Sequence, residues 1–160
     1  MADPGQYLTF QLNGQMYGVP VASVREINRV VEVTPIPQTP PFVVGVMNLR
    51  GKVIPVIGLR QKFGLSAVEN SKETCIIIIE AELGQVGVIV DAVRSVVDLN
   101  RDQIELTPSL GDQKTESLIL GLGKLDEKVI ILIDVAKAVS GQNLSTISNI
   151  SNGVPIQKIA

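Results

Sequence analysis

Hydrophobic residues in the first half of the chain occur in short runs, several of which alternate with polar residues. Alternation with a period of two is typical of a half-buried strand, because successive side chains point to opposite faces. Asn13-Gly14 and Arg50-Gly51 separate such runs into pairs, and Asn-Gly is a strong signal for a hairpin turn. The pattern predicts strands at residues 7–12, 16–21, 24–33, 42–48 and 52–57, followed by a short helical turn at 59–63.

The second half of the chain has a similar organisation. Its apolar runs predict strands at residues 75–80, 86–91, 93–99, 118–125 and 128–133, and a short helix at 135–139. A polar loop is expected between the third and fourth of these strands, through Thr115. The remaining residues, 142–160, are rich in Ser and Asn and are expected to form a flexible tail, with a marginal docking helix as the alternative.

Glycines and charged residues recur in the same order in the two halves. Residues 18–25 correspond to residues 87–94 at an offset of 69, and residues 52–57 correspond to residues 128–133 at an offset of 76. The difference places seven additional residues in the second copy. We interpret this similarity as an internal duplication. The alternative is a chance likeness between strands rich in Val and Ile.

Each half, approximately residues 6–66 and 73–141, holds about five short strands and is too small to be stable alone. The halves are therefore expected to share an apolar seam. Closure of each sheet into a small barrel would remove exposed strand edges. The sequence predicts one all-β domain over residues 6–141, made of two similar five-stranded β-barrels packed together, with short helical turns. Whether strands are exchanged between the barrels is left open.

The composition supports β structure and excludes several kinds of chemistry. The 160 residues include 22 Val and 18 Ile, whose branched side chains favour strands. The chain has no His, which excludes Ser-His and Cys-His nucleophiles and an imidazole base. Cys75 is the one Cys, so neither a zinc site nor an internal disulfide is expected. We expect no catalytic residue, cofactor or metal; an enzyme using Asp, Glu and Lys is the alternative.

Charge and hydropathy give no signal for nucleic-acid binding, a membrane span or secretion, and the single Cys fits a reducing, cytosolic setting. With 14 basic and 16 acidic residues the net charge is −2, which offers no basic field for nucleic acid. The longest apolar runs, residues 76–79 and 129–133, are too short to span a membrane, so no direct membrane insertion is expected. The first residues carry no basic and apolar pattern of a secretory signal.

Arg50 is the most conspicuous charged residue, because it occupies a turn between two apolar strands. A guanidinium presents five donors in a rigid fork and suits bidentate pairing with a carboxylate. Glu26 lies within the apolar stretch Val24-Arg25-Glu26-Ile27 and is the natural partner inside the chain. Such a pair contributes little when fully exposed, and more at an interface from which water is excluded.

The order of several motifs closely resembles the CheW family of chemotaxis coupling proteins. The motifs are Tyr17-Gly18-Val19, Val24-Arg25-Glu26-Ile27, Asn48-Leu49-Arg50-Gly51, Val53-Ile54-Pro55-Val56-Ile57 and the residue 86–93 segment. The resemblance spans about residues 6–141. It implies two five-stranded barrels and a non-enzymatic cytoplasmic adaptor that joins membrane-associated receptor arrays through its partners.

The partners that the resemblance implies are the cytoplasmic tips of methyl-accepting chemoreceptors and the regulatory domain of the histidine kinase CheA. The receptor tip would lie in a groove between the barrels. The positions similar to the receptor-facing set of the family are Val24, Glu26, Gly45, Asn48, Leu49 and Arg50. The kinase-facing surface is left open. Alternatives are an equivalent adaptor in a twitching-motility or other non-flagellar array, and a β-barrel binding module for an unrelated ligand.

Gly58 departs from the family pattern, which usually has Asp at this position. The second half keeps an acid, Asp134, at the matching place. An Asp would cap the short helix that follows, and Gly at an N-cap costs only a few tenths of a kcal/mol. We expect Gly58 to loosen this turn without abolishing the fold. Asp91, at the end of an apolar strand, is expected to act as a strand-end cap.

Overall fold

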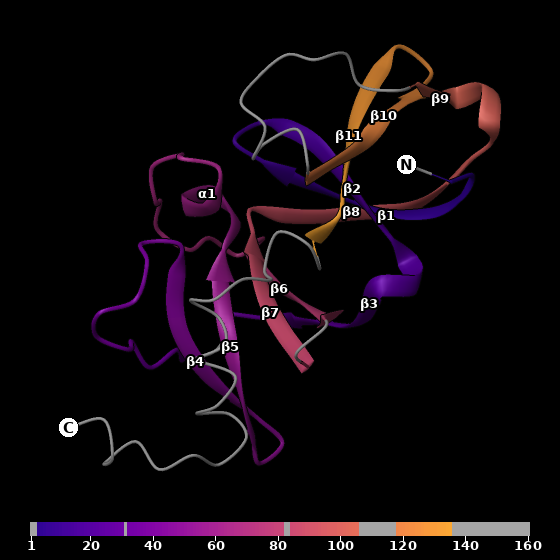
Figure 1. The fold of residues 1–160 in the computed structure, drawn as a ribbon. Coiled ribbons are helices and arrows are strands. Elements are labelled where there is room, and N and C mark those ends of the chain that lie inside the picture. The colour runs from indigo at the N-terminus through magenta and orange to yellow at the C-terminus, as the bar shows by residue number, and fades with distance from the viewer. Residues whose placement is uncertain (1–2, 31, 82–83, 106–117, 136–160) are drawn as a thin grey trace.

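The computed structural model describes residues 3–30, 32–81, 84–105 and 118–135. It consists almost entirely of strands (Figure 1). The elements of the first half are β1 (Gly5–Leu12), β2 (Gln15–Pro20), η1 (Val21–Ser23), β3 (Val24–Arg29), β4 (Val43–Leu49), β5 (Lys52–Gly58) and α1 (Leu59–Lys62). Those of the second half are β6 (Cys75–Ala81), β7 (Gly84–Val90), β8 (Ala92–Leu99), η2 (Arg101–Gln103), β9 (Ile104–Glu105), β10 (Ile119–Leu125) and β11 (Lys128–Ile133).

The strands form two sheets, and each sheet draws strands from both halves of the chain. One sheet has the order β8-β1-β2-β11-β10-β9, and the other has the order β3-β6-β7-β5-β4. We call them the first and the second barrel. Figure 1 shows them as two adjoining units, with α1 beside the second. The chain crosses from the first barrel to the second between β2 and β3, and back again between β7 and β8.

Each sheet curls until its two outer parts meet. In the second barrel Thr34, beyond the end of β3, forms an antiparallel bridge with Val46 of β4, with N–O distances of 2.8 and 2.9 Å. In the first barrel β9, beyond the end of β8, pairs with β10 through Glu105 and Leu122. The two closures use matching segments of the two halves. The predicted all-β architecture of two packed barrels is confirmed, with β9 as an additional short strand in the first.

The two barrels have the same strand order once β1–β5 are matched to β6, β7, β8, β10 and β11. Their parallel pairs also have the same register. Leu132 pairs with Gly18 in the first barrel, and Val56 pairs with Gly87 in the second. Both pairs are related by the offsets found in the sequence. This is the arrangement that a duplication with exchanged strands predicts, and the repeat boundaries themselves remain a prediction.

Aliphatic residues fill both barrels and the space between them. The largest cluster of buried residues joins β1, β2 and β11 of the first barrel to β4, β5, β6 and β7 of the second. Smaller clusters lie inside each barrel, around Leu132 in the first and around Ile76 and Ile78 in the second. The apolar seam that the sequence predicts is therefore the largest part of the core, because neither curved sheet can bury its apolar faces alone.

One predicted loop was partly wrong. The polar residues after β8 do not remain irregular, because Asn100 and Gln103 cap each other: the Asn100 Oδ1 accepts from the Gln103 amide, and the Gln103 Oε1 accepts from the Asn100 amide. This capping box starts η2 and places Ile104 against the core of the first barrel. The predictions for residues 106–115, for the helix at 135–139 beyond its first residue, and for the tail at 142–160 lie outside the described residues.

Candidate docking site

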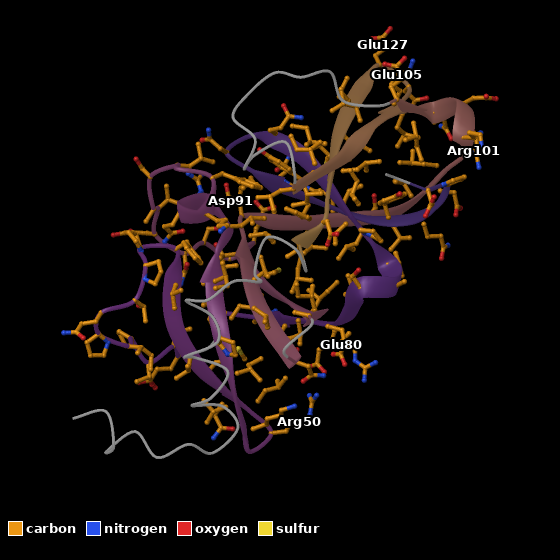
Figure 2. All side chains as sticks on the ribbon, viewed as in Figure 1. Arg50, Glu80, Asp91, Arg101, Glu105 and Glu127 are labelled. Atoms are coloured by element: carbon orange, nitrogen blue, oxygen red, sulfur yellow. The ribbon has the colours of Figure 1, made fainter. Side chains whose placement is uncertain are left out.

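Arg50 and Glu26 form a bidentate ion pair at one end of the second barrel. Arg50 Nη1 donates to Glu26 Oε1 at 3.0 Å, and Arg50 Nη2 donates to Glu26 Oε2 at 2.6 Å. The side chain of Arg50 is 70 % exposed, whereas that of Glu26 is 28 % exposed. Figure 2 shows Arg50 at the tip of the β4–β5 hairpin, far from Asp91. The pair that the sequence predicts is therefore present, and its cation faces outward.

The β4–β5 turn holds Arg50 in an unusual backbone conformation. Arg50 and Gly51 have φ angles of 51° and 87°, as a two-residue hairpin of the primed type requires. Asn48 stabilises the turn, because its Oδ1 accepts a hydrogen bond from the Gly51 amide at 2.8 Å. Asn48 thus belongs to the predicted set as the residue that fixes the turn, while Arg50 presents the charge.

The carboxylate of Glu26 accepts a hydrogen bond from its own strand as well as from Arg50. Alternation along β3 places Val24, Glu26 and Asn28 on its half-buried face. Asn28 Nδ2 donates to Glu26 Oε1 at 2.9 Å. The hydrogen bonds from Arg50 and then Asn28 lower the pKa of Glu26 to about 2. Asn28 was missed by the sequence analysis, although the period of two along β3 could have found it.

The apolar members of the predicted set flank this ion pair. Val24 is half-buried and packs against the core shared by the barrels. Leu49 is also half-buried and packs against the core of the second barrel. Each keeps part of its surface exposed. The site is therefore an ion pair with an aliphatic residue on each side: Val24 on β3, near Glu26, and Leu49 at the end of β4, next to Arg50.

Gly45 differs from the other predicted residues, because it is buried. Its φ angle is 153°, and a Cβ at this position would collide with the carbonyl oxygen of Thr34. The close approach allows Thr34 to bridge Val46 and close the barrel. Gly45 can thus affect a docking surface only by shaping the backbone beneath it.

A second bidentate pair lies beyond the other end of β5. Arg60 Nε and Nη2 donate to Asp91 Oδ1 and Oδ2 at 2.8 and 2.7 Å. The side chains of Arg60 and Asp91 are 16 % and 26 % exposed, respectively. Asp91 Oδ2 also accepts from the amide of Asn13 at 2.8 Å. Asp91 therefore caps the β1–β2 hairpin, and its pairing with Arg60 was not predicted because the two residues are far apart in sequence.

Gly58 is the N-cap of α1 and has extended backbone angles. The space beside its Cα is taken by the carboxamide of Gln61. An Asp at this position would have to displace that flexible side chain. The turn itself is well formed, because the amide of Phe63 donates to the carbonyl of Leu59 at 3.1 Å.

Within the described parts of the chain, no three His, Cys, Asp or Glu side chains gather in a way that could hold a metal ion. In the same residues, no helix has the length and hydropathy needed to cross a membrane. The candidate site offers groups suited to protein recognition. These are an exposed guanidinium, a carboxylate that is already paired with it, and aliphatic side chains beside them.

The structure thus consists of two packed β-barrels with an exposed ion pair at one end of the second, and comparison with known proteins identifies its family. Residues 6–143 match the family model of the CheW-like domain. The chemotaxis protein CheW of Klebsiella aerogenes is 34 % identical over 146 residues, which cover 91 % of this chain and 88 % of that protein. CheW of Bacillus subtilis is 35 % identical over 127 residues, covering 79 % of this chain and 81 % of that protein.

A solved structure shows the same fold. The crystal structure of the scaffolding protein TtCheW from Thermoanaerobacter tengcongensis matches with a TM-score of 0.79 and 36 % sequence identity, covering 88 % of this chain and 95 % of that one. The chain belongs to the CheW-like domain family. It is accordingly a non-enzymatic scaffold of the chemotaxis type.

Proposed function

We propose that this protein couples the cytoplasmic tips of chemoreceptors to the histidine kinase CheA, in the cytoplasm at membrane-associated receptor arrays. The observation that carries the proposal is the Arg50–Glu26 pair, which is exposed on its cationic side and flanked by the half-buried side chains of Val24 and Leu49. These four residues, with Asn48, form the receptor-binding surface of the proposal.

The geometry of Arg50 suits a partner that adds a carboxylate or carbonyl to the existing pair. A guanidinium has five N–H donors, and the bonds to Glu26 use two of them. The remaining donors are available to a docked helix. Because Glu26 and the rigid turn already hold the guanidinium, little side-chain entropy is lost when a partner binds.

The aliphatic neighbours would supply much of the affinity. A helical hairpin that lays its apolar face across Val24 and Leu49 would exclude water from the ion pair. Exclusion of water strengthens the electrostatic interaction between Arg50 and its partners. The pair would then fix the register of the helix, while the apolar contacts hold it in place.

The proposal is tested by co-sedimentation of the protein with receptor-tip fragments and CheA, scored for assembly and kinase activation. Arg50→Asp and Val24→Met should weaken receptor binding, while circular dichroism stays close to that of the parent and thermal melts show that each variant is folded at the assay temperature. Arg94→Asp is the matched control, because Arg94 forms an exposed pair with Glu73 on another part of the surface. If all variants bind receptor-tip fragments as well as the parent does, the proposed site is wrong. If the parent itself binds neither receptor tips nor CheA, the proposed function is wrong.

A further inference from the structure

The segment that follows β5 is anchored to both barrels. α1 continues directly from β5 of the second barrel, and Arg60 on α1 forms the bidentate pair with Asp91. Arg60 Nη1 also donates to the carbonyl of Ser66 at 3.1 Å, which ties down the start of the connection towards β6. One side chain thus fixes the helix, the following loop and the Asp91 crossover.

Phe63 makes a second contact from the end of α1, this time with the first barrel. Its ring stacks on Tyr17 of β2, with 5.7 Å between the ring centroids. Tyr17 in turn stacks on Phe10 of β1 at 5.8 Å. The three stacked rings therefore connect the end of α1 to the first barrel, although α1 directly follows β5 of the second barrel.

Asp91 lies where the chain passes from β7 in the second barrel to β8 in the first. Its carboxylate accepts hydrogen bonds from Arg60 on the second-barrel side and from the Asn13 amide on the first-barrel side. The Asp91 amide also donates to the carbonyl of Gln11 in β1 at 3.1 Å. A single residue at the crossover is thus bonded to both barrels.

The sequence does not repeat this pair at the matching positions of the other half. The offsets of 69 and 76 match Asp91 to Ala22 and Arg60 to Ala136, and alanine cannot form an ion pair. The charged contact is therefore not part of the internal repeat. One junction is held by charge and aromatic contacts, and the matching residues of the other cannot reproduce the charged contact.

We propose that Arg60 and Asp91 are positioning residues that set the angle between the two barrels and thereby transmit receptor binding to the kinase. The part of the proposal that concerns the angle rests on the contacts of Arg60 and Asp91, whereas the effect on kinase activity rests on the proposed function. A bidentate pair fixes both the distance and the orientation of the two groups that it joins, in addition to the aliphatic contacts between the sheets.

The Arg60–Asp91 pair lies far from the proposed receptor-binding surface. Arg50 and Arg60 flank the seven residues of β5, which at about 3.3 Å per residue span roughly 23 Å. Substitutions at sites this far apart should be nearly additive in their effects on binding. Loss of the Arg60–Asp91 pair should therefore leave the receptor surface intact and change how the two barrels are held.

The angle is measured by spin-label distances between the two hairpin tips. Labels are placed at Lys52→Cys on the second barrel and Glu127→Cys on the first, in a Cys75→Ser background. Both labelled positions are exposed. Arg60→Met and Asp91→Asn are the test variants, and Arg94→Met, which removes the exposed pair with Glu73, is the matched control. Arg60→Lys keeps the charge but not the bidentate geometry and should give an intermediate result.

Each test variant should broaden or shift the distance distribution relative to the parent and to Arg94→Met. Receptor-tip binding should stay within about twofold of the parent, while kinase activation in the three-component assembly falls about fivefold or more. An unchanged distance distribution in folded variants would overturn the proposal. So would loss of folding in both variants, since the pair would then be a requirement of the fold. If the parent shows no kinase coupling, the proposed function fails, and the distances still decide whether the pair sets the angle.

Discussion

Arg50 and Glu26 join strands that stand at opposite ends of one sheet. Glu26 lies on β3 and Arg50 follows β4, the first and last strands in the order β3-β6-β7-β5-β4. Their bidentate contact is possible because the sheet closes into a barrel, which the Thr34–Val46 bridge also shows. The candidate docking site is thus located where the first and last strands of the second barrel meet.

The Glu26 pair should make stability depend on pH in the acid range. Its pKa is lowered from 4.5 to about 2 in the folded protein. The pair therefore stabilises the fold fully above the unfolded-state pKa, and this contribution is lost as the pH falls from about 4.5 towards 2. Glu26→Gln should lower the melting temperature at pH 7, and the difference from the parent should shrink in acid.

Thermal melts of the parent and Glu26→Gln between pH 7 and pH 2 check this expectation. Glu73→Gln is the control, because it removes the carboxylate of another exposed arginine pair. A difference between Glu26→Gln and the parent that stays constant over this pH range would contradict the role of the carboxylate charge.

The Arg60–Asp91 pair should contribute more to stability than the exposed arginine pairs. Its side chains are largely buried, and Asp91 also bonds the Asn13 amide. A hydrogen bond to a charged group contributes about 1.5–3 kcal/mol. The hydrogen bonds of one guanidinium are not additive, so Arg60→Met should lower the free energy of unfolding by about 2 kcal/mol. Arg94→Met should change it by less than about 1 kcal/mol. Urea denaturation measures both; equal effects would show that burial adds nothing.

Gly45 should tolerate no side chain. In Gly45→Ala the new Cβ would meet the Thr34 carbonyl oxygen, and the positive φ adds strain. We expect a loss of about 3 kcal/mol in the free energy of unfolding, from overpacking and backbone strain together. Gly51→Ala is the control, because Gly51 also has a positive φ but has open space around it. It should cost only about 1 kcal/mol. Similar losses for both variants would rule out the collision.

Gly58→Asp should be tolerated and slightly stabilising. The N-cap of α1 already has the extended angles that a capping Asp adopts, and the obstructing group is the mobile end of Gln61. The gain should be a few tenths of a kcal/mol. Gly58→Ala adds the same Cβ without a capping oxygen and should bring no gain. A large destabilisation by Gly58→Asp would show that the Gln61 carboxamide cannot move.

The sequence by itself determined the local elements of this protein. Alternating apolar residues specified the strands, and Asn-Gly and Arg-Gly dipeptides specified two hairpin turns, because both signals depend on neighbouring residues. The Arg50–Glu26 pair could also be predicted, since a charge inside an apolar strand requires a partner and few candidates exist.

Only the tertiary structure decided how these elements combine. The exchange of the β1–β2 and β6–β7 hairpins between the two halves, the burial of Gly45 under Thr34 and the Arg60–Asp91 pair all depend on contacts between distant segments. Such contacts leave no periodic signal in the sequence. They arise because two curved sheets, neither able to bury its apolar faces alone, must close on themselves and pack against each other.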